Sequence, residues 1–161
     1  MSGVGASADE PLRLPLTVRL PYDYAVGRYG SRFMTALRDE GKFYGTRDPV
    51  SGAVLVPPRP INGMTGEHLD EWVEVGPAGT VTGCTIVETP FVDPMTGRQR
   101  PIPYGFAFIR LDGADTNIYH FLEASRHEDI RVGMRVEAVF KPRAERVGSL
   151  ADVICFRTLE P

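Results

Sequence analysis

The sequence predicts a mainly β protein with one helix near its N-terminus, and two observations support this fold class. The chain has 17 Gly and 14 Pro among 161 residues, which favours many turns and short strands over long helices. From residue 71 onward, short runs of β-branched and aromatic residues alternate with turn residues, as in consecutive strands. A chain of this length can form a core without a metal ion or a disulfide.

Residues 1–21 are expected to form a flexible arm. They are rich in Gly, Ser, Ala and Pro and show no helical period. Leu12, Leu14 and Leu16 alternate with other residues, so the end of the arm has a pattern suited to pairing with a sheet edge or a partner. Neither a secretory segment nor an apolar run of about 20 residues occurs, which predicts a soluble, cytoplasmic protein without a membrane partner.

Residues 22–41 are predicted to contain an amphipathic helix. Tyr29, Phe33 and Leu37 recur every four residues, and Gly41 occupies the position where a left-handed residue ends a helix. One helix of about fourteen residues is marginal alone, so its apolar stripe must pack on its own domain or on another chain. We take these three apolar residues as candidate partner-docking residues.

Residues 42–70 are predicted to form a small, turn-rich hairpin segment. Two short strands over 42–46 and 53–56 are joined by a turn, and Asn62-Gly63 forms a second turn. The segment is too short and too rich in turns to enclose a conventional hydrophobic core.

The two turns of this segment have a distinctive spacing. Asp48 and Ser51 are separated by two residues, as are Asn62 and Thr65, and ten residues lie between the pairs. This is the spacing of a four-cysteine zinc ribbon, in which each turn aims two thiolates at one ion. Asp48 is at best a weak zinc ligand, and the other three offer neutral oxygens that suit zinc poorly. Taken alone, the residues also fit two ordinary β-turns.

Residues 71–161 are predicted to form a five-stranded barrel of the OB type. A short helical element, expected within 125–133, precedes the fourth barrel strand, an arrangement that suits this barrel type. A plain β-sandwich is the alternative on pattern alone. The β-rich runs are 72–75, 80–89, 104–111, 117–122, 136–141 and 151–157.

Several motifs, in this order, resemble the acyl-CoA-associated zinc-ribbon/OB-fold family between about residues 22 and 156. They are GKFYGTRDPVSG at 41–52, VPPRP at 56–60, EWVEV at 71–75, GTV at 79–81 and RVGMRVEAVF at 131–140. The resemblance implies an N-terminal helix, a rubredoxin-like ribbon and an OB-fold barrel. The family's four metal cysteines fall on Asp48, Ser51, Asn62 and Thr65, which implies a degenerate ribbon without bound zinc.

The resemblance also implies a function. Family members accompany thiolase-like or hydratase-like enzymes of acyl-CoA metabolism. We therefore expect a non-catalytic accessory subunit in lipid, steroid or polyketide-like metabolism, in a hetero-oligomer and without a cofactor of its own. A coenzyme A thioester is the expected ligand, if the chain binds one.

The loop over 90–103 carries the candidate ligand-binding residues. Phe91, Arg98, Arg100 and the following Tyr104 combine guanidinium groups with apolar side chains, which would suit a phosphorylated, partly apolar ligand such as an acyl-CoA. Arg59, in the Pro-Pro-Arg-Pro segment, is added to this set. The alternative for the loop is an ordinary polar hairpin connection.

The sequence contains no recognisable catalytic set. His68, His120 and His127 are scattered, and Cys84 lies within a predicted strand without a base nearby in sequence. An independent acyl-transfer enzyme is therefore disfavoured. A single-stranded nucleic-acid-binding OB module is the alternative function, because Tyr104 begins an alternation of aromatic residues on one strand. The net charge of −3 argues against nucleic acid.

Overall fold

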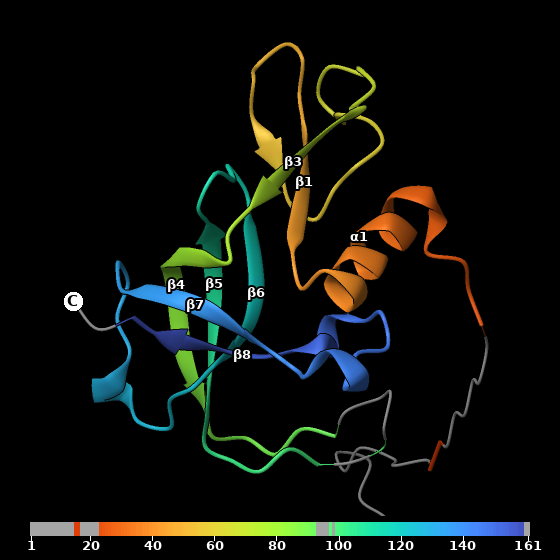
Figure 1. Ribbon diagram of the computed structural model, residues 1–161. Coiled ribbons are helices and arrows are strands. Elements are labelled where there is room, and N and C mark those ends of the chain that lie inside the picture. Colours follow the sequence, from red (N-terminus) through yellow and green to blue (C-terminus); the bar gives the residue numbers. More distant parts are fainter. Residues whose placement is uncertain (1–14, 17–22, 93–96, 98, 160–161) are drawn as a thin grey trace, which may run out of the picture.

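A helix and a small antiparallel sheet lie against one end of a closed barrel in the computed structural model, which describes residues 15–16, 23–92, 97 and 99–159 (Figure 1). The arm predicted for residues 1–21 falls outside the described residues except for Pro15 and Leu16. Within the described part of the chain, no helix combines the length and apolar character needed to cross a bilayer.

Helix α1 (Gly27–Asp39) forms where the amphipathic pattern predicted it. Its apolar stripe faces the protein's own core, since Phe33 is 2% exposed and Leu37 is fully buried. The helix ends at Asp39, and Gly41 follows with a φ of 67°, a conformation that suits glycine. Their own chain thus covers both Phe33 and Leu37, which leaves neither side chain exposed for the docking role predicted from the sequence.

The small sheet has the order β2-β1-β3 and is antiparallel throughout. It comprises β1 (Phe43–Arg47), β2 (Val54–Leu55) and β3 (Glu71–Val75). The domain boundary predicted at residue 71 assigned the residues of β3 to the barrel. In the structure, β3 pairs along its whole length with β1 of the small sheet. Alternation within a single strand predicts the strand but does not identify its hydrogen-bonded neighbour.

The barrel closes in the order β4-β5-β6-β8-β7, and β6 with β8 is its parallel pair. The 3-10 helix η1 (His127–Asp129) precedes the fourth barrel strand. This topology is that of an OB-fold, so the predicted mainly β fold with a five-stranded barrel is confirmed. Its strands are β4 (Ala78–Val87), β5 (Tyr104–Leu111), β6 (Asn117–Leu122), β7 (Arg135–Phe140) and β8 (Val153–Thr158). The β7–β8 connection contains η2 (Arg143–Glu145) and η3 (Leu150–Asp152).

One side chain, Phe43 of β1, joins the helix, the small sheet and the barrel. Its ring centroid lies 6.4 Å from that of Phe33 in α1 and 5.3 Å from that of Phe140 in β7. It also stacks on Phe156 of β8 at 6.3 Å. The buried residues of all three parts belong to one hydrophobic cluster, so the small sheet is fixed in position on the barrel.

Hydrogen bonds from Asp115 and Thr116 to the backbone of Val54 and Val56 reinforce this junction. The turn between β5 and β6 continues the edge of the small sheet, because Thr116 Oγ1 both accepts from the Val56 N–H at 2.7 Å and donates to the Val56 carbonyl at 2.8 Å. Asp115 makes a similar pair with Val54, at 2.8 and 2.9 Å. The short strand β2 is thus held on both of its edges.

Candidate functional site

The two turns of the small sheet meet at a buried carboxylate. Asp48 is 1% exposed, and its Oδ2 accepts hydrogen bonds from Ser51 Oγ at 2.6 Å and Asn62 Nδ2 at 2.7 Å. Its Oδ1 accepts from the Val50 N–H at 3.0 Å. These bonds, above all that from Ser51, hold the pKa of Asp48 below its usual value. We call Asp48, Ser51 and Asn62 the Asp48 node.

The Asp48 node does not fit a zinc ion. Both carboxylate oxygens of Asp48 already accept hydrogen bonds, and the amide nitrogen of Asn62 points toward Asp48 as a donor. Thr65, the fourth position of the spacing, is exposed and accepts instead from the Glu67 N–H at 3.3 Å. Among the described residues, no group of three or more His, Cys, Asp or Glu side chains is arranged for a metal.

The remaining predicted docking residue, Tyr29, packs on the small sheet. Its ring stacks on Trp72 at 5.3 Å and its hydroxyl donates to Asp70 at 2.9 Å. The guanidinium carbon of Arg32 lies 4.2 Å from the centroid of the Trp72 ring. Trp72 is partly buried, and two residues of α1 contact its ring.

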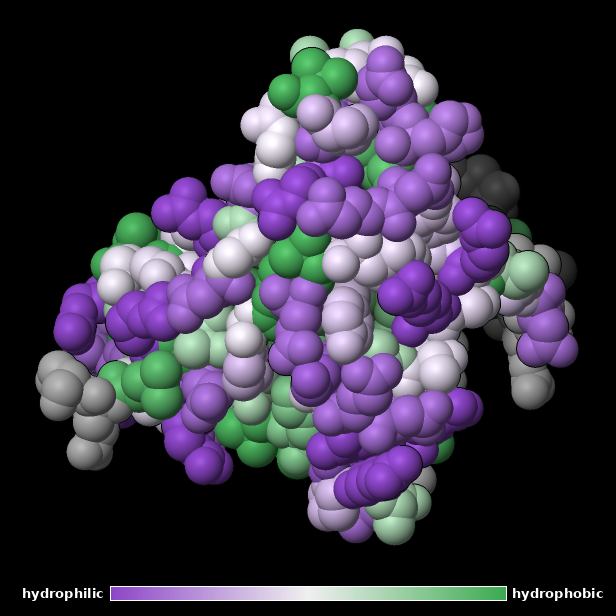
Figure 2. Space-filling model, turned by 45° about the horizontal axis from the view of Figure 1, so that its top comes forward, coloured by the Kyte–Doolittle hydropathy of each residue, from purple (hydrophilic) through white to green (hydrophobic). Residues whose placement is uncertain are grey.

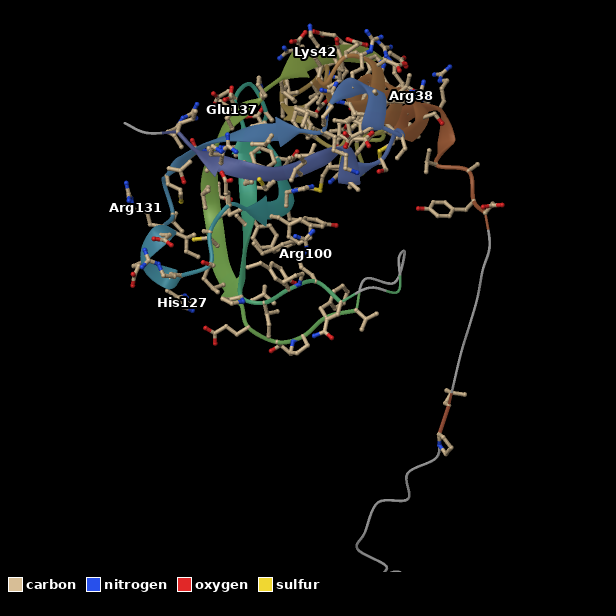
Figure 3. The ribbon with its side chains drawn as sticks, turned by 60° about the horizontal axis from the view of Figure 1, so that its bottom comes forward. Arg38, Lys42, Arg100, His127, Arg131 and Glu137 are labelled. Atoms are coloured by element: carbon tan, nitrogen blue, oxygen red, sulfur yellow. The ribbon has the colours of Figure 1, made fainter. Side chains whose placement is uncertain are left out.

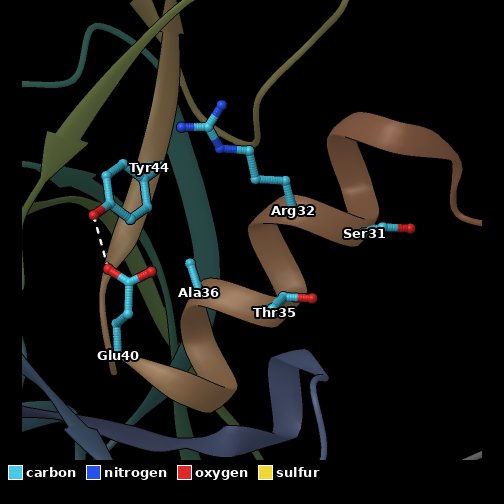
Figure 4. A pocket seen from close by; sticks show the side chains of 6 residues that line it. All are labelled: Ser31, Arg32, Thr35, Ala36, Glu40 and Tyr44. Atoms are coloured by element: carbon cyan, nitrogen blue, oxygen red, sulfur yellow. Dashed lines mark hydrogen bonds between the residues drawn. The ribbon is translucent and has the colours of Figure 1, made fainter.

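An open depression of about 270 Å³ lies between α1 and β1. Tyr44 donates to Glu40 across one end of it at 2.9 Å, and Figure 4 shows this bond at the base of the helix. Five of its six lining side chains are polar or charged, although their carbon atoms supply more of its surface than their polar atoms do. The lining residues are Ser31, Arg32, Thr35, Ala36, Glu40 and Tyr44.

The predicted ligand set is only partly brought together. Arg100 reaches back from the β4–β5 loop toward the barrel (Figure 3), with its guanidinium carbon 5.5 Å from the Tyr104 ring centroid. Phe91 lies in the same loop and is 54% exposed, and Arg98 is outside the described residues. Arg59 is on the segment after β2, at the opposite end of the molecule from the β4–β5 loop in Figure 1, where its backbone bonds to Thr46.

The outer face of β5 and β6 carries a continuous row of aromatic rings. Successive neighbours in this row have centroids 5.6–6.2 Å apart and interplanar angles of 43–74°. The residues between them along each strand point inward and are buried. We call this set the aromatic stripe. It comprises Tyr104, Phe106, Phe108, Tyr119 and Phe121.

Phe108 and Tyr119 are the most accessible members of the stripe, at 51% and 65% exposed. They are directly paired across β5 and β6. The alternation from Tyr104 to Phe108 was predicted from the sequence, whereas the contribution of Tyr119 and Phe121 in β6 was not. The same alternation in β6 was the available signal, but only the strand pairing places the two rows side by side.

The three histidines remain apart in the fold. His120 points into the barrel, where Nε2 lies 3.2 Å from the Leu150 carbonyl and the buried Nδ1 has no partner. Burial lowers the pKa of His120. His127 lies in η1, 3.9 Å from Glu88, and His68 is in the segment before β3. None of the three contacts another, so they form no joint site.

Neither cysteine is in an activating environment. Cys84 and Cys155 are free and partly buried, on β4 and β8 respectively. Burial raises the pKa of the Cys155 thiol, which lowers the fraction of reactive thiolate.

These features define a class of protein: an OB-fold barrel preceded by a helix and a small sheet, with aromatic residues on its second and third strands. Residues 72–141 match the family model described as the ChsH2 C-terminal OB-fold domain. The resemblance to the acyl-CoA-associated zinc-ribbon/OB-fold family is thereby confirmed for the barrel. No curated protein matches the chain in sequence.

Solved structures with the same fold cover most of the chain. One is the Ltp2-ChsH2(DUF35) aldolase, with a TM-score of 0.61 and 19% sequence identity over 84% of this chain and 98% of that one. Another is a protein of unknown function from the DUF35 family of Sulfolobus solfataricus, with a TM-score of 0.56 and 19% identity. This match covers 82% of this chain and 84% of that protein's chain.

Proposed function

We propose that this protein is a non-catalytic accessory subunit of an acyl-CoA enzyme. The observation that carries the proposal is the match of its barrel to the ChsH2 C-terminal OB-fold domain. The name of a structure with this fold, Ltp2-ChsH2(DUF35) aldolase, joins a ChsH2 chain to Ltp2. By extension, the partner here is a thiolase-like or hydratase-like enzyme acting in lipid, steroid or polyketide-like metabolism.

The described side chains support a binding role over a catalytic one. His120 is buried with a lowered pKa, and burial raises the pKa of the Cys155 thiol. General acid–base or nucleophilic catalysis requires such a group within hydrogen-bond reach of another and open to substrate. The exposed aromatic stripe, by contrast, is a surface suited to contact with another molecule.

Purification of the tagged protein from its native host, with mass spectrometry of the retained proteins, tests this function. We expect one acyl-CoA enzyme at a fixed stoichiometry, and acyl-CoA-dependent activity only when that enzyme is present. Turnover by the isolated chain alone would contradict the non-catalytic role. Recovery of the chain as a free monomer would contradict the accessory role.

A further inference from the structure

We propose that the aromatic stripe is the surface on which this chain docks its partner enzyme, and that the partner contributes an apolar ridge with carboxylates at its ends. The proposal rests on the accessory function proposed above and specifies where the contact lies. It replaces the docking role first assigned to α1, whose apolar stripe packs into the protein's own core.

The composition of the stripe fits the centre of a protein–protein interface. Aromatic residues and arginine are enriched at such centres, and a few of them supply most of the binding energy. Phe108 and Tyr119 stand side by side on paired strands and are more than half exposed. Large rings on paired strands of a closed barrel lose little conformational freedom when they are covered, so they are suitable anchors.

The charges at the two ends of the stripe identify the chemistry of the partner. Arg100 lies over Phe121 at 3.5 Å, at the Tyr104 end of the stripe. Arg110 is exposed at the other end of β5. Neither forms an ion pair with a described carboxylate, and Glu123, two residues after Phe121, is paired with Arg157 at 2.5 Å. Carboxylates on a partner surface would complement both guanidinium groups.

The same charges disfavour a second copy of this chain as the occupant. If two stripes met face to face in opposite directions, Arg100 of one copy would lie against Arg110 of the other. Like charges facing each other across an interface cost several kcal/mol. The occupant is therefore a different, acidic surface.

Ring geometry favours a protein over single-stranded nucleic acid. Bases stack on open ring faces within a basic groove. Here neighbouring rings meet at 43–74°, so each ring covers part of another, and the Arg100 guanidinium covers a face of Phe121. The net charge of −3 also lacks the phosphate-neutralising excess that nucleic-acid binding requires.

The decisive experiment measures the affinity of stripe variants for the acyl-CoA enzyme recovered by the purification described above. We expect the F108A/Y119A double variant to weaken binding by about 30-fold or more, as at interface hot spots. Arg100→Glu should weaken binding more than Arg100→Gln, and the difference should shrink at high salt. The matched control is V50A/M64A, which removes two exposed apolar side chains from the turns of the small sheet and should bind like the wild type.

Each outcome decides between the alternatives. If the enzyme binds the wild type and F108A/Y119A equally, the docking proposal is wrong while the accessory function stands. If the wild type retains no enzyme, the accessory function fails and the docking proposal fails with it. If the wild type binds a dT20 oligonucleotide with a Kd below about 1 μM, as a functional OB module would, and F108A/Y119A abolishes that binding, the stripe is a nucleic-acid surface. Melting curves of all variants exclude unfolding as the cause of any loss.

Discussion

The small sheet and the barrel are joined in one core but are stabilised by different kinds of interaction. The barrel encloses fully buried apolar side chains such as Val81, Ile109 and Val136. The small sheet holds its two turns together through the Asp48 node, and its outer face carries exposed ion pairs such as Lys42–Glu74. Figure 2, which brings the top of the molecule forward, shows mostly hydrophilic residues there with scattered apolar areas.

This contrast explains how the small sheet, whose two turns have the residue spacing of a zinc ribbon, holds its shape with other residues at those positions. A tetrahedral ion joins two turns by strong directional bonds. At the Asp48 node, a buried carboxylate joins the same two turns by hydrogen bonds, and the barrel supports one side of the sheet through Phe43. Apolar cores tolerate volume-conserving exchanges, whereas a buried polar cluster depends on each donor and acceptor. The two regions should therefore respond differently to substitution.

The largest effect is expected from Phe43→Ala, because this ring connects both regions. Removing a fully buried Phe costs about 3–5 kcal/mol of unfolding free energy. Chemical denaturation should show this loss as a single transition for the whole molecule. Phe108→Ala is the control, since that ring is half exposed, and an equal loss there would argue against the central role of Phe43.

Asp48→Ala is expected to have a smaller and more local effect. It leaves Asn62 Nδ2 and Ser51 Oγ without their acceptor, so amide hydrogen exchange should accelerate in the two turns of the small sheet and stay slow in β5 and β6. Because the folded-state pKa of Asp48 is lowered, its stabilising contribution is present at neutral pH and is lost as the pH falls below about 3.8. Uniform acceleration across the barrel would show that the node is not local.

Trp72→Ala is expected to cost about 1–2 kcal/mol, less than for a buried ring. The ring is only partly buried and is held by stacking with Tyr29 and by the Arg32 guanidinium. Thermal unfolding measures the loss. If Trp72→Ala costs nothing further once Arg32→Ala is present, the cation–π contact accounts for the loss. A cost as large as that of Phe43→Ala would mean that the helix and sheet are more interdependent than the contacts indicate.

The unfolding free energy should depend modestly on pH because of one buried group in the barrel, His120. Burial lowers the folded-state pKa of His120, so below its ordinary value of 6.5 the unfolded chain binds a proton that the folded chain resists. Stability should therefore fall as the pH decreases from about 6.5. In the His120→Phe variant this slope should be reduced, as measured by urea denaturation at pH 7.5 and pH 5.5. An unchanged slope would assign the effect to other groups.

No effect is expected from chelator. We propose that the Asp48 node takes the place of a metal, so EDTA should leave the melting temperature unchanged and metal analysis should find no stoichiometric zinc. About one zinc per chain, or a loss of stability in EDTA, would contradict this. The variant in which Asp48, Ser51, Asn62 and Thr65 are all replaced by Cys is an informative comparison, because restored thiolates should make stability zinc-dependent.

Local sequence patterns were sufficient to predict the elements themselves. The recurrence of Phe33 and Leu37 located α1, and alternation within β5 and β6 located the barrel strands, because both periods are set by backbone geometry within one element. The paired spacing of Asp48 with Ser51 and of Asn62 with Thr65 located the two turns of the small sheet. These features depend on residues close together in the chain.

The tertiary structure decided which surfaces remained free. Packing placed Phe33 and Leu37 in the core and left Phe108 and Tyr119 exposed, although all four are apolar residues in regular elements. Strand pairing moved β3 from the predicted barrel to the small sheet. The segment after β2, which carries Arg59, lies at the opposite end of the molecule from the β4–β5 loop, which carries Arg100. Burial of a side chain depends on neighbours that are distant in sequence. A local sequence pattern carries no information about which of these contacts form. For this reason the sequence alone predicted the elements, whereas only the folded chain identified the aromatic stripe as a continuous surface.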